Sequence, residues 1–331
     1  MEYAKPHLPY DKQLELITSR GMTYADRRVA SQALKRIGYY RLSAYTYVFR
    51  KPGPPLPNGD PGPRSDTFVS GATLDDALAL HNFDRDLRAV LLEGLHIIEV
   101  GLRVRIGYTL GKTARFGHLT SAALDPTACA ARRNRRDGSE CTAFDKWLDH
   151  YTGLVNEAKS EVYVQHFHAK YDSKIPVWVA TEFMTFGALL WLYELLNDAD
   201  ANKIAADLGI RERGLFHRYL KALNVLRNHC SHNARVWNRA TTYPPAKPPK
   251  HITPETIHHL KHADNDKVYF LAALCAHLIP AIEPTSNWPR RFATVAKKFP
   301  APHGMTVENM MGFPSGWTSL PLWNYEPPKP K

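Results

Sequence analysis

The chain has 331 residues, enough for two domains or for one large domain with added segments. Hydrophobic residues make up 44% of it and charged residues 23%, as in a globular protein and unlike a disordered one. No apolar run reaches the ~18–20 residues of a membrane-spanning helix, and the first residues lack the apolar core of a secretory signal. We therefore expect a soluble, cytoplasmic protein that has no membrane partner.

Cysteine spacing and net charge narrow the classes of function. Four cysteines, none of them in a C-x-x-C pair, predict neither a disulfide framework nor a structural zinc site. Lysine and arginine number 43 against 32 acidic residues, a formal charge of +11. A surplus of this size favours a polyanionic partner, nucleic acid above all.

The first 72 residues are predicted to contain two short helices. One covers about 11–20, and the other runs from Thr23, whose hydroxyl is expected to cap it, to about Ile37. The aromatic run at 39–49 fits a strand or a helix about equally well. Residues 51–65 are almost all Pro, Gly and polar, which predicts an exposed loop.

A long helix is predicted from Leu74 to about Leu110, with Thr73 as its N-cap. Three glycines inside it either weaken the helix or let a neighbouring helix approach closely: Gly94, Gly101 and Gly107.

The remainder is also predicted to be helical. A basic run at 131–138 is expected to be a loop, and helices follow at about 143–170, 178–197, 201–208, 212–240 and 254–278. The fold class is therefore all-α. We expect an N-terminal helical region at 1–72, a core at 73–245, and a C-terminal helical region at 246–331 that wraps around the core.

The helix at 212–240 carries the residues that suggest chemistry. On an ideal helix Phe216, Leu223, Leu226, Cys230, Ala234 and Trp237 share an apolar face, and the opposite arc holds Asn224, Asn228, Ser231, His232, Arg235 and Arg239. Arg227 lies at the seam between the two faces. Histidine titrates near neutral pH, and arginine grips phosphate oxygens with a planar fork.

Such a pair suits RNA cleavage by the neighbouring 2′-OH. His232 is predicted to move a proton and Arg227 to neutralise charge that builds on phosphorus. The nucleophile belongs to the substrate, so neither a metal ion nor a cofactor is expected. Spacing alone is weak evidence, because Arg and His are frequent in this chain and a surface helix with a solvated polar face would show the same pattern.

The segment RNHCSHNARVWNR resembles the R-N-x-x-x-H signature of the HEPN ribonuclease superfamily, in the form found in Abi-like (AbiD/AbiF) abortive-infection proteins. Four further segments resemble that family in the same order: IGYYRLSAY (37–45), FDRDLRAVLLEGLHIIEVGLRVRI (83–106), PVWVATEFMTFG (176–187) and MGFPSGW…PLW (311–323).

The resemblance implies a helical HEPN-type core in which two such motifs meet, and hence a homodimer with a composite site. It also implies antiphage defence by RNA cleavage, with a small non-coding RNA as a regulator of some members. Arg227, His232 and Asn228 would be catalytic, and Arg235 and Arg239 would bind neighbouring phosphates. A toxin partner that is modified by a nucleotidyltransferase is not expected, because Ala234 stands where those proteins have Tyr.

Supporting roles are assigned to Glu99, Arg103 and Ser231. Glu99 could orient Arg227 or His232, or could form a surface pair with Arg103 four residues on. Four arginines of the basic run could grip RNA or could belong to a solvated loop: Arg132, Arg133, Arg135 and Arg136.

Three alternatives stay open. Four residues that match the family in the 176–187 segment could serve packing alone: Pro176, Trp178, Glu182 and Gly187. His258, His259 and His262 have helical spacing but lack the companions of a zinc site. Finally, the protein could bind RNA without cutting it, or act as a toxin–antitoxin module held by a small non-coding RNA.

Overall fold

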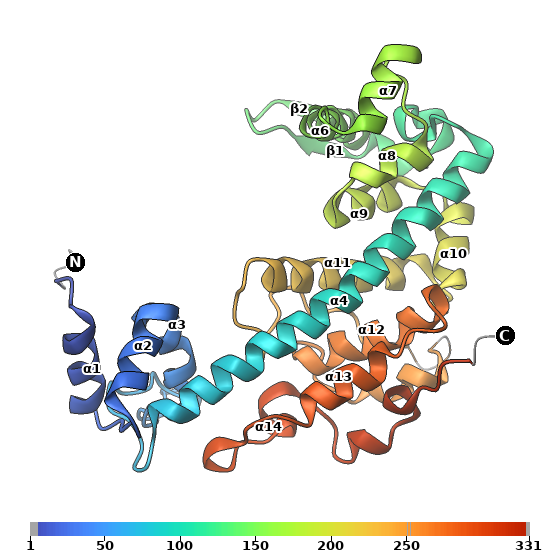
Figure 1. Ribbon diagram of the computed structural model, residues 1–331. Coiled ribbons are helices and arrows are strands. Elements are labelled where there is room, and N and C mark those ends of the chain that lie inside the picture. The colour runs from blue at the N-terminus through green and yellow to red at the C-terminus, as the bar shows by residue number, and fades with distance from the viewer. Residues whose placement is uncertain (1–5, 250, 252, 329–331) are drawn as a thin grey trace.

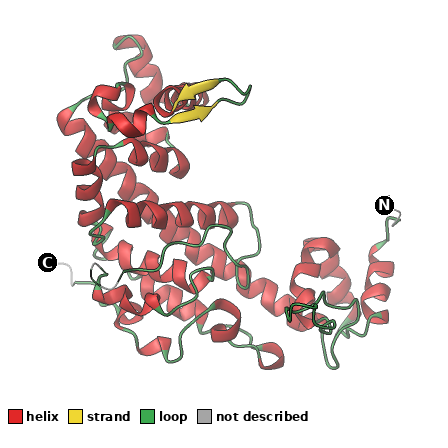
Figure 2. Ribbon diagram, turned by 180° about the vertical axis from the view of Figure 1, so that it is seen from behind, coloured by secondary structure: helices red, strands yellow, loops and turns green. Residues whose placement is uncertain are grey.

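One helix, α4 (Leu74–Thr113), crosses the whole molecule in the computed structural model (Figure 1). The structure describes residues 6–249, 251 and 253–328. The 40 residues of α4 span about 60 Å at 1.5 Å per residue. Thr73 caps it by accepting a hydrogen bond from the Asp76 N–H at 3.0 Å, as predicted. The described chain is mainly α-helical, which confirms the predicted class (Figure 2).

The three glycines predicted to weaken α4 or to admit a neighbouring helix are sites of close approach, so the second of their two predicted roles is confirmed. A Cβ at Gly94 would lie 2.5 Å from the Trp288 ring, and one at Gly101 would lie 2.7 Å from Ile282. At Gly107 the backbone of Trp178 comes within 3.0 Å of that position. Helices from the middle and the end of the chain therefore pack directly on the α4 backbone.

The N-terminal region packs at the start of α4 (Figure 1). It consists of α1 (Tyr10–Ser19), α2 (Arg27–Ile37), α3 (Tyr39–Thr46) and a 3₁₀ turn at Tyr47–Phe49. The ambiguous aromatic run is therefore helical. The predicted cap of α2 was wrong, because Asp26 accepts from two backbone N–H groups there, whereas Thr23 pairs with Thr73 in an isolated β-bridge. Residues 51–65 form no regular element, as predicted.

The middle of the chain surrounds the other end of α4. Its elements are α5 (Pro126–Ala130), β1 (Arg132–Asn134), β2 (Glu140–Thr142), α6 (Ala143–Glu157), α7 (Val162–Lys170), α8 (Val177–Phe183), α9 (Phe186–Leu195) and α10 (Asp198–Asp207). The helices predicted at 143–170 and 178–197 are each broken in two. The second break follows from Thr185, whose side chain caps α9.

The basic run is a hairpin, so the predicted loop was wrong. Strands β1 and β2 pair antiparallel, with Arg133 opposite Cys141. Gly138 takes φ +85° in the turn, and the Arg135 N–H donates to the Ser139 carbonyl at 2.9 Å. Asp137-Gly138 is a common hairpin-turn sequence, so the signal was present in the chain.

The C-terminal region runs along α4 as α12 (Val268–Ile282) and α13 (Trp288–Ala296), followed by α14 (Val307–Met311). The helix predicted at 254–278 is instead a 3₁₀ segment, Glu255–Lys261, then a break, then α12. Aromatic rings from the 311–323 segment pack on these helices: Trp323 stacks on Phe292 at 5.0 Å between centroids, and Phe313 lies 4.7 Å from Tyr269.

Buried residues from all three predicted regions join one hydrophobic core cluster, which includes Leu34, Leu91, Phe216 and Trp288. Of the helices in the described part of the chain, none combines the length and apolar composition that a membrane crossing demands.

Candidate active site

The R-N-x-x-x-H segment lies at the end of α11 (Arg213–Ser231). Glu212 caps the start of this helix, with its carboxylate accepting from the N–H groups of Gly214 and Leu215 at 2.6 and 2.7 Å. The predicted apolar face is buried in the core through Phe216, Leu223, Leu226 and Cys230. The motif thus stands on a well-anchored helix.

The helix ends earlier than predicted. His232 is its C-cap residue, and Asn233 takes φ +55°, a left-handed conformation that Asn and Gly favour at this position. The predicted extension to residue 240 was therefore wrong, and Arg235 and Arg239 do not share a helical arc with Asn228, Ser231 and His232. His232, Asn228 and Ser231 are exposed at the helix end, and the Ser231 hydroxyl donates to the Arg227 carbonyl at 2.9 Å.

Glu99 on α4 joins two arginines. Its Oε2 lies 3.4 Å from Nε of Arg227, and its Oε1 lies 3.3 Å from a guanidinium nitrogen of Arg103. Arg103 also donates to the Met184 carbonyl at 3.0 Å. Glu99 therefore contacts both Arg227 and Arg103, two of the partners considered for it. Because the Glu99 side chain is only 9% exposed, the Glu99–Arg103 pair is not a surface pair.

This arrangement fixes the base of the Arg227 side chain and leaves the group partly open. The Arg227 side chain is 27% exposed. One carboxylate faces two guanidinium groups, so the Glu99–Arg103–Arg227 cluster keeps a net positive charge. Such a cluster can attract a phosphate.

A second carboxylate of α4, Asp84, holds the segment that follows His232. It accepts from the N–H groups of Val236 and Trp237, at 3.1 and 2.9 Å, and from the Tyr45 hydroxyl at 2.6 Å. Asp84 is fully buried and is paired with the buried Arg88. Burial and the Asp84 charge raise the pKa of Tyr45, which therefore stays a neutral donor.

The N-terminal region also contacts this segment. Arg41 donates to the Asn233 carbonyl at 3.1 Å, and Arg235 donates to the Ala44 carbonyl at 2.9 Å. Burial lowers the pKa of Arg235, without making it neutral near pH 7. The Arg235 guanidinium thus anchors the loop to α3, and its predicted contact with phosphate stays a prediction.

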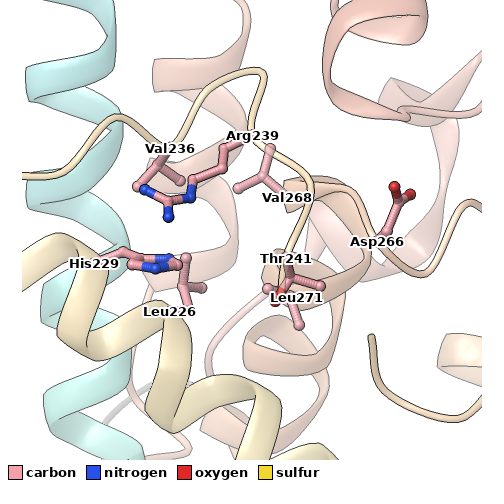
Figure 3. Close-up of a pocket in the computed structure, with 8 residues that line it drawn as sticks. All are labelled: Leu226, His229, Val236, Arg239, Thr241, Asp266, Val268 and Leu271. Carbon is pink, nitrogen blue, oxygen red and sulfur yellow. The ribbon is translucent and has the colours of Figure 1, made fainter. Parts of the chain in front are cut away.

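Arg239 lies over His229, a residue of α11 that the sequence analysis did not select (Figure 3). The hollow that they line with Thr241 and Asp266 has a volume of about 10 Å³, room for about one water molecule. Burial and, secondarily, Arg239 lower the pKa of His229. The hollow is too small for a nucleotide.

Three of the four arginines of the hairpin face carboxylates. Arg132 lies 3.6 Å from Glu140, Arg133 lies 3.5 Å from Glu194, and Arg135 lies 2.8 Å from Asp149. Arg136 forms no ion pair within the described residues. The run is less available to RNA than its charge suggested, and its role stays a prediction.

Two of the three histidines at 258–262 have other partners. His259 Nε2 lies 2.8 Å from the Tyr269 hydroxyl, and burial lowers the pKa of this histidine. His258 lies 3.5 Å from Lys261. Within the residues that the structure describes, no group of three or more His, Cys, Asp or Glu side chains gathers in a metal-binding arrangement.

The comparisons with known proteins identify the family. A search of curated proteins and a search of solved structures each gave no match. The model of the family described as Abi-like protein matches residues 32–238, which is more than half of the chain and includes α4, α11 and the whole R-N-x-x-x-H segment. The chain therefore belongs to the Abi-like protein family.

Proposed function

We propose that this protein is an endoribonuclease that acts without a metal ion, in abortive-infection defence against phage. The observation that carries the proposal is the placement of Arg227 on the buried Glu99, at the end of a helix whose cap residue is the exposed His232. A surface helix with a merely solvated polar face does not need a buried carboxylate to hold its arginine.

The proposed reaction uses the 2′-OH of the RNA. The 2′-oxygen forms a bond to phosphorus while the bond from phosphorus to the 5′-oxygen breaks. One proton leaves the 2′-OH and one reaches the 5′-oxygen, giving a 2′,3′-cyclic phosphate and a 5′-hydroxyl. His232 moves one of these protons, Arg227 neutralises charge on the phosphoryl oxygens, and Asn228 orients the strand.

A homodimer supplies the second acid–base group. On α4, directly beside Glu99 and Arg103, three apolar side chains repeat every four residues and are 51%, 58% and 68% exposed: Val100, Val104 and Tyr108. An apolar stripe that faces water is typical of an interaction surface. A second copy that covers it would bring another Arg227–His232 pair towards the same phosphate.

Six arginines are proposed to bind the RNA backbone: Arg132, Arg133, Arg135, Arg136, Arg235 and Arg239. Of these, Arg136 and Arg239 make neither an ion pair nor a side-chain hydrogen bond within the described residues. We rank these two first, because the others would have to exchange an existing partner for a phosphate.

The test is cleavage of end-labelled single-stranded RNA in EDTA, beside DNA of the same sequence. Arg227→Ala and His232→Ala are compared with Arg218→Ala and His262→Ala, which remove exposed residues of the same types away from the motif. We expect RNA-only cleavage, cyclic phosphate ends, a dimer by light scattering, and a loss of about 10²–10⁴-fold for His232→Ala.

Cleavage that stops in EDTA, or survives both motif substitutions, would contradict the mechanism. Tight RNA binding without cleavage would instead favour the alternative, a non-catalytic RNA-binding protein or a toxin–antitoxin module held by a small non-coding RNA.

A further inference from the structure

A second pocket lies at the far end of α4 from the N-terminal region, between the end of α4, α7 and the start of α8. It has a volume of about 450 Å³, within the ~300–1,000 Å³ of small-ligand pockets. Trp178 forms part of its wall and is held by the α4 backbone, since a Cβ at Gly111 would lie 2.8 Å from the Trp178 ring. This wall is rigid.

Aromatic rings dominate the lining. Phe116, Phe167, Tyr171 and Trp178 all contribute. Tyr171 and Trp178 are 53% and 47% exposed, and the Phe167 and Tyr171 rings lie 5.2 Å apart between centroids. Large rings presented to water in a hollow form a platform on which a flat ligand can stack.

The charge of the lining is positive. Arg115 and Lys174 both line the pocket and are exposed, and none of the described residues that line it carries a carboxylate. Lys174 has one distant partner, Asp172 at 3.9 Å, and Arg115 forms no ion pair within the described residues. The pocket therefore combines stacking surfaces with two cations that are free to bind an anion.

A strained turn connects an aromatic residue of the pocket, Tyr171, to one of its cations, Lys174. Between them Asp172 and Ser173 take φ values of +51° and +59°, a left-handed conformation that non-glycine residues rarely adopt. The turn is held in place because the Ser173 hydroxyl lies 2.6 Å from Nδ1 of His168 and the Ser173 N–H donates to the Phe167 carbonyl. Strain that is held in this way is concentrated at functional sites.

We propose that this α7–α8 pocket binds a nucleotide, with the base against the aromatic rings and the phosphate on Arg115 and Lys174. The nucleotide belongs either to a single-stranded RNA or to the pool of free mononucleotides; the RNA source rests on the proposed function. An acidic peptide would use the cations but not the rings, and an apolar ligand would use the rings but not the cations.

The pocket is placed to act with the candidate active site. Glu99, Arg103, Gly107 and Gly111 follow one another at four-residue intervals on α4, with Arg227 at one end and Trp178 at the other. The twelve residues from Glu99 to Gly111 span about 18 Å. Helix α8 runs along part of this distance, because it begins at the pocket and its C-cap residue Met184 accepts from Arg103.

The test uses the full-length protein carrying His232→Ala, so that RNA stays intact and binding is measured whether or not the protein is a nuclease. The probes are a short fluorescein-labelled single-stranded RNA, followed by anisotropy, and AMP, followed by calorimetry. The pocket variants are Tyr171→Ala and the double variant Arg115→Gln/Lys174→Gln. Val162→Ala and Lys170→Gln are matched controls on exposed residues of α7 outside the pocket.

We expect Tyr171→Ala to weaken RNA binding by about 5- to 150-fold, the effect of losing one stacked base. The double variant should reduce the slope of log affinity against log salt by about 1.4, because two single-strand phosphate contacts are lost. If AMP also binds and is lost in both variants, the pocket takes free nucleotides; if only RNA binding weakens, it takes a nucleotide of the strand.

Either result supports the proposal. Equal affinities of pocket variants and unsubstituted protein for both RNA and AMP, or equal losses in pocket and control variants, would overturn it. Failure of the proposed nuclease activity would leave these measurements unaffected.

Discussion

Replacing Asp84 with alanine tests whether the buried carboxylate holds the segment after His232. Asp84 and Arg88 are 0% and 5% exposed. Among the described residues, the only other groups that Arg88 reaches are the Tyr45 hydroxyl at 3.4 Å and the Ala234 carbonyl at 3.5 Å. Asp84→Ala therefore leaves a buried guanidinium without its charge partner, which costs about 3–5 kcal/mol. Two buried N–H groups of the 236–237 segment also lose their acceptor.

A double-mutant cycle separates the pair from general packing. The free energy of unfolding is measured in urea at fixed pH for Asp84→Ala, for Arg88→Met and for the double variant. We expect the double variant to be less destabilised than the sum of the two single variants by ~2 kcal/mol or more, because no unpaired charge remains in it. Asp86→Ala is the control, since this exposed neighbour pairs with Arg85 alone among the residues that the structure describes, and its loss should cost at most about 1 kcal/mol.

The Asp84→Ala variant is also tested for RNA cleavage. Asp84→Ala protein that remains folded should lose RNA cleavage although Arg227 and His232 are intact, because the chain after His232 has lost its anchor. Additive single effects, or a cost for Asp84→Ala no larger than that of Asp86→Ala, would refute the reasoning.

Three further predictions use the same core. Gly94→Ala should lower the free energy of unfolding in urea by about 1–3 kcal/mol, because the added methyl group would clash with the Trp288 ring. Gly153→Ala, where the added methyl group meets open space, should instead raise the free energy of unfolding by about 0.5–1 kcal/mol. Equal effects of the two substitutions would contradict this prediction. Burial lowers the pKa of His118 to about 3, so only the unfolded state takes up this proton between about pH 6 and 4, and stability falls on acidification. His118→Phe should reduce the slope of the free energy of unfolding against pH by up to about 1.4 kcal/mol per pH unit. An unchanged slope would exclude His118 as the source of this pH dependence. Glu99→Gln should lower kcat for RNA about tenfold or more with a smaller change in KM, while a change confined to KM would mean that it acts in binding alone.

Local signals allowed much of the fold to be predicted. The helical period and the Thr73 cap gave both the length and the start of α4, since each depends on residues within a turn or two. The buried face of α11 followed in the same way. Two local signals pointed the other way from the predictions. Asn233 ends α11, although the continuing helical periodicity favoured a longer helix. Asp137-Gly138 forms the turn of the hairpin, although the high charge of this run favoured a loop.

The partners of the site residues could not be predicted, because they come from distant parts of the chain. Asp84 accepts from N–H groups about 150 residues further on, and Arg133 of β1 faces Glu194 of α9. The sequence shows that these residues are charged, but only the packing of α4 against α11 and α3 decides which charges meet. The sequence favours RNA contacts for the hairpin arginines, because it shows their charge and does not show their carboxylate partners.

The two residues proposed for catalysis are held by two different carboxylates of one helix. Glu99 holds Arg227 through its side chain, and Asp84 holds the backbone that follows His232. Fifteen residues of α4, about 22 Å, separate these carboxylates, so the direction of α4 fixes one anchor relative to the other. The spacing of the motif along the sequence therefore does not by itself set the geometry of the site. Another protein can have the motif at the same spacing but lack two such carboxylates on a packed helix. It would not hold its arginine and histidine in the same arrangement.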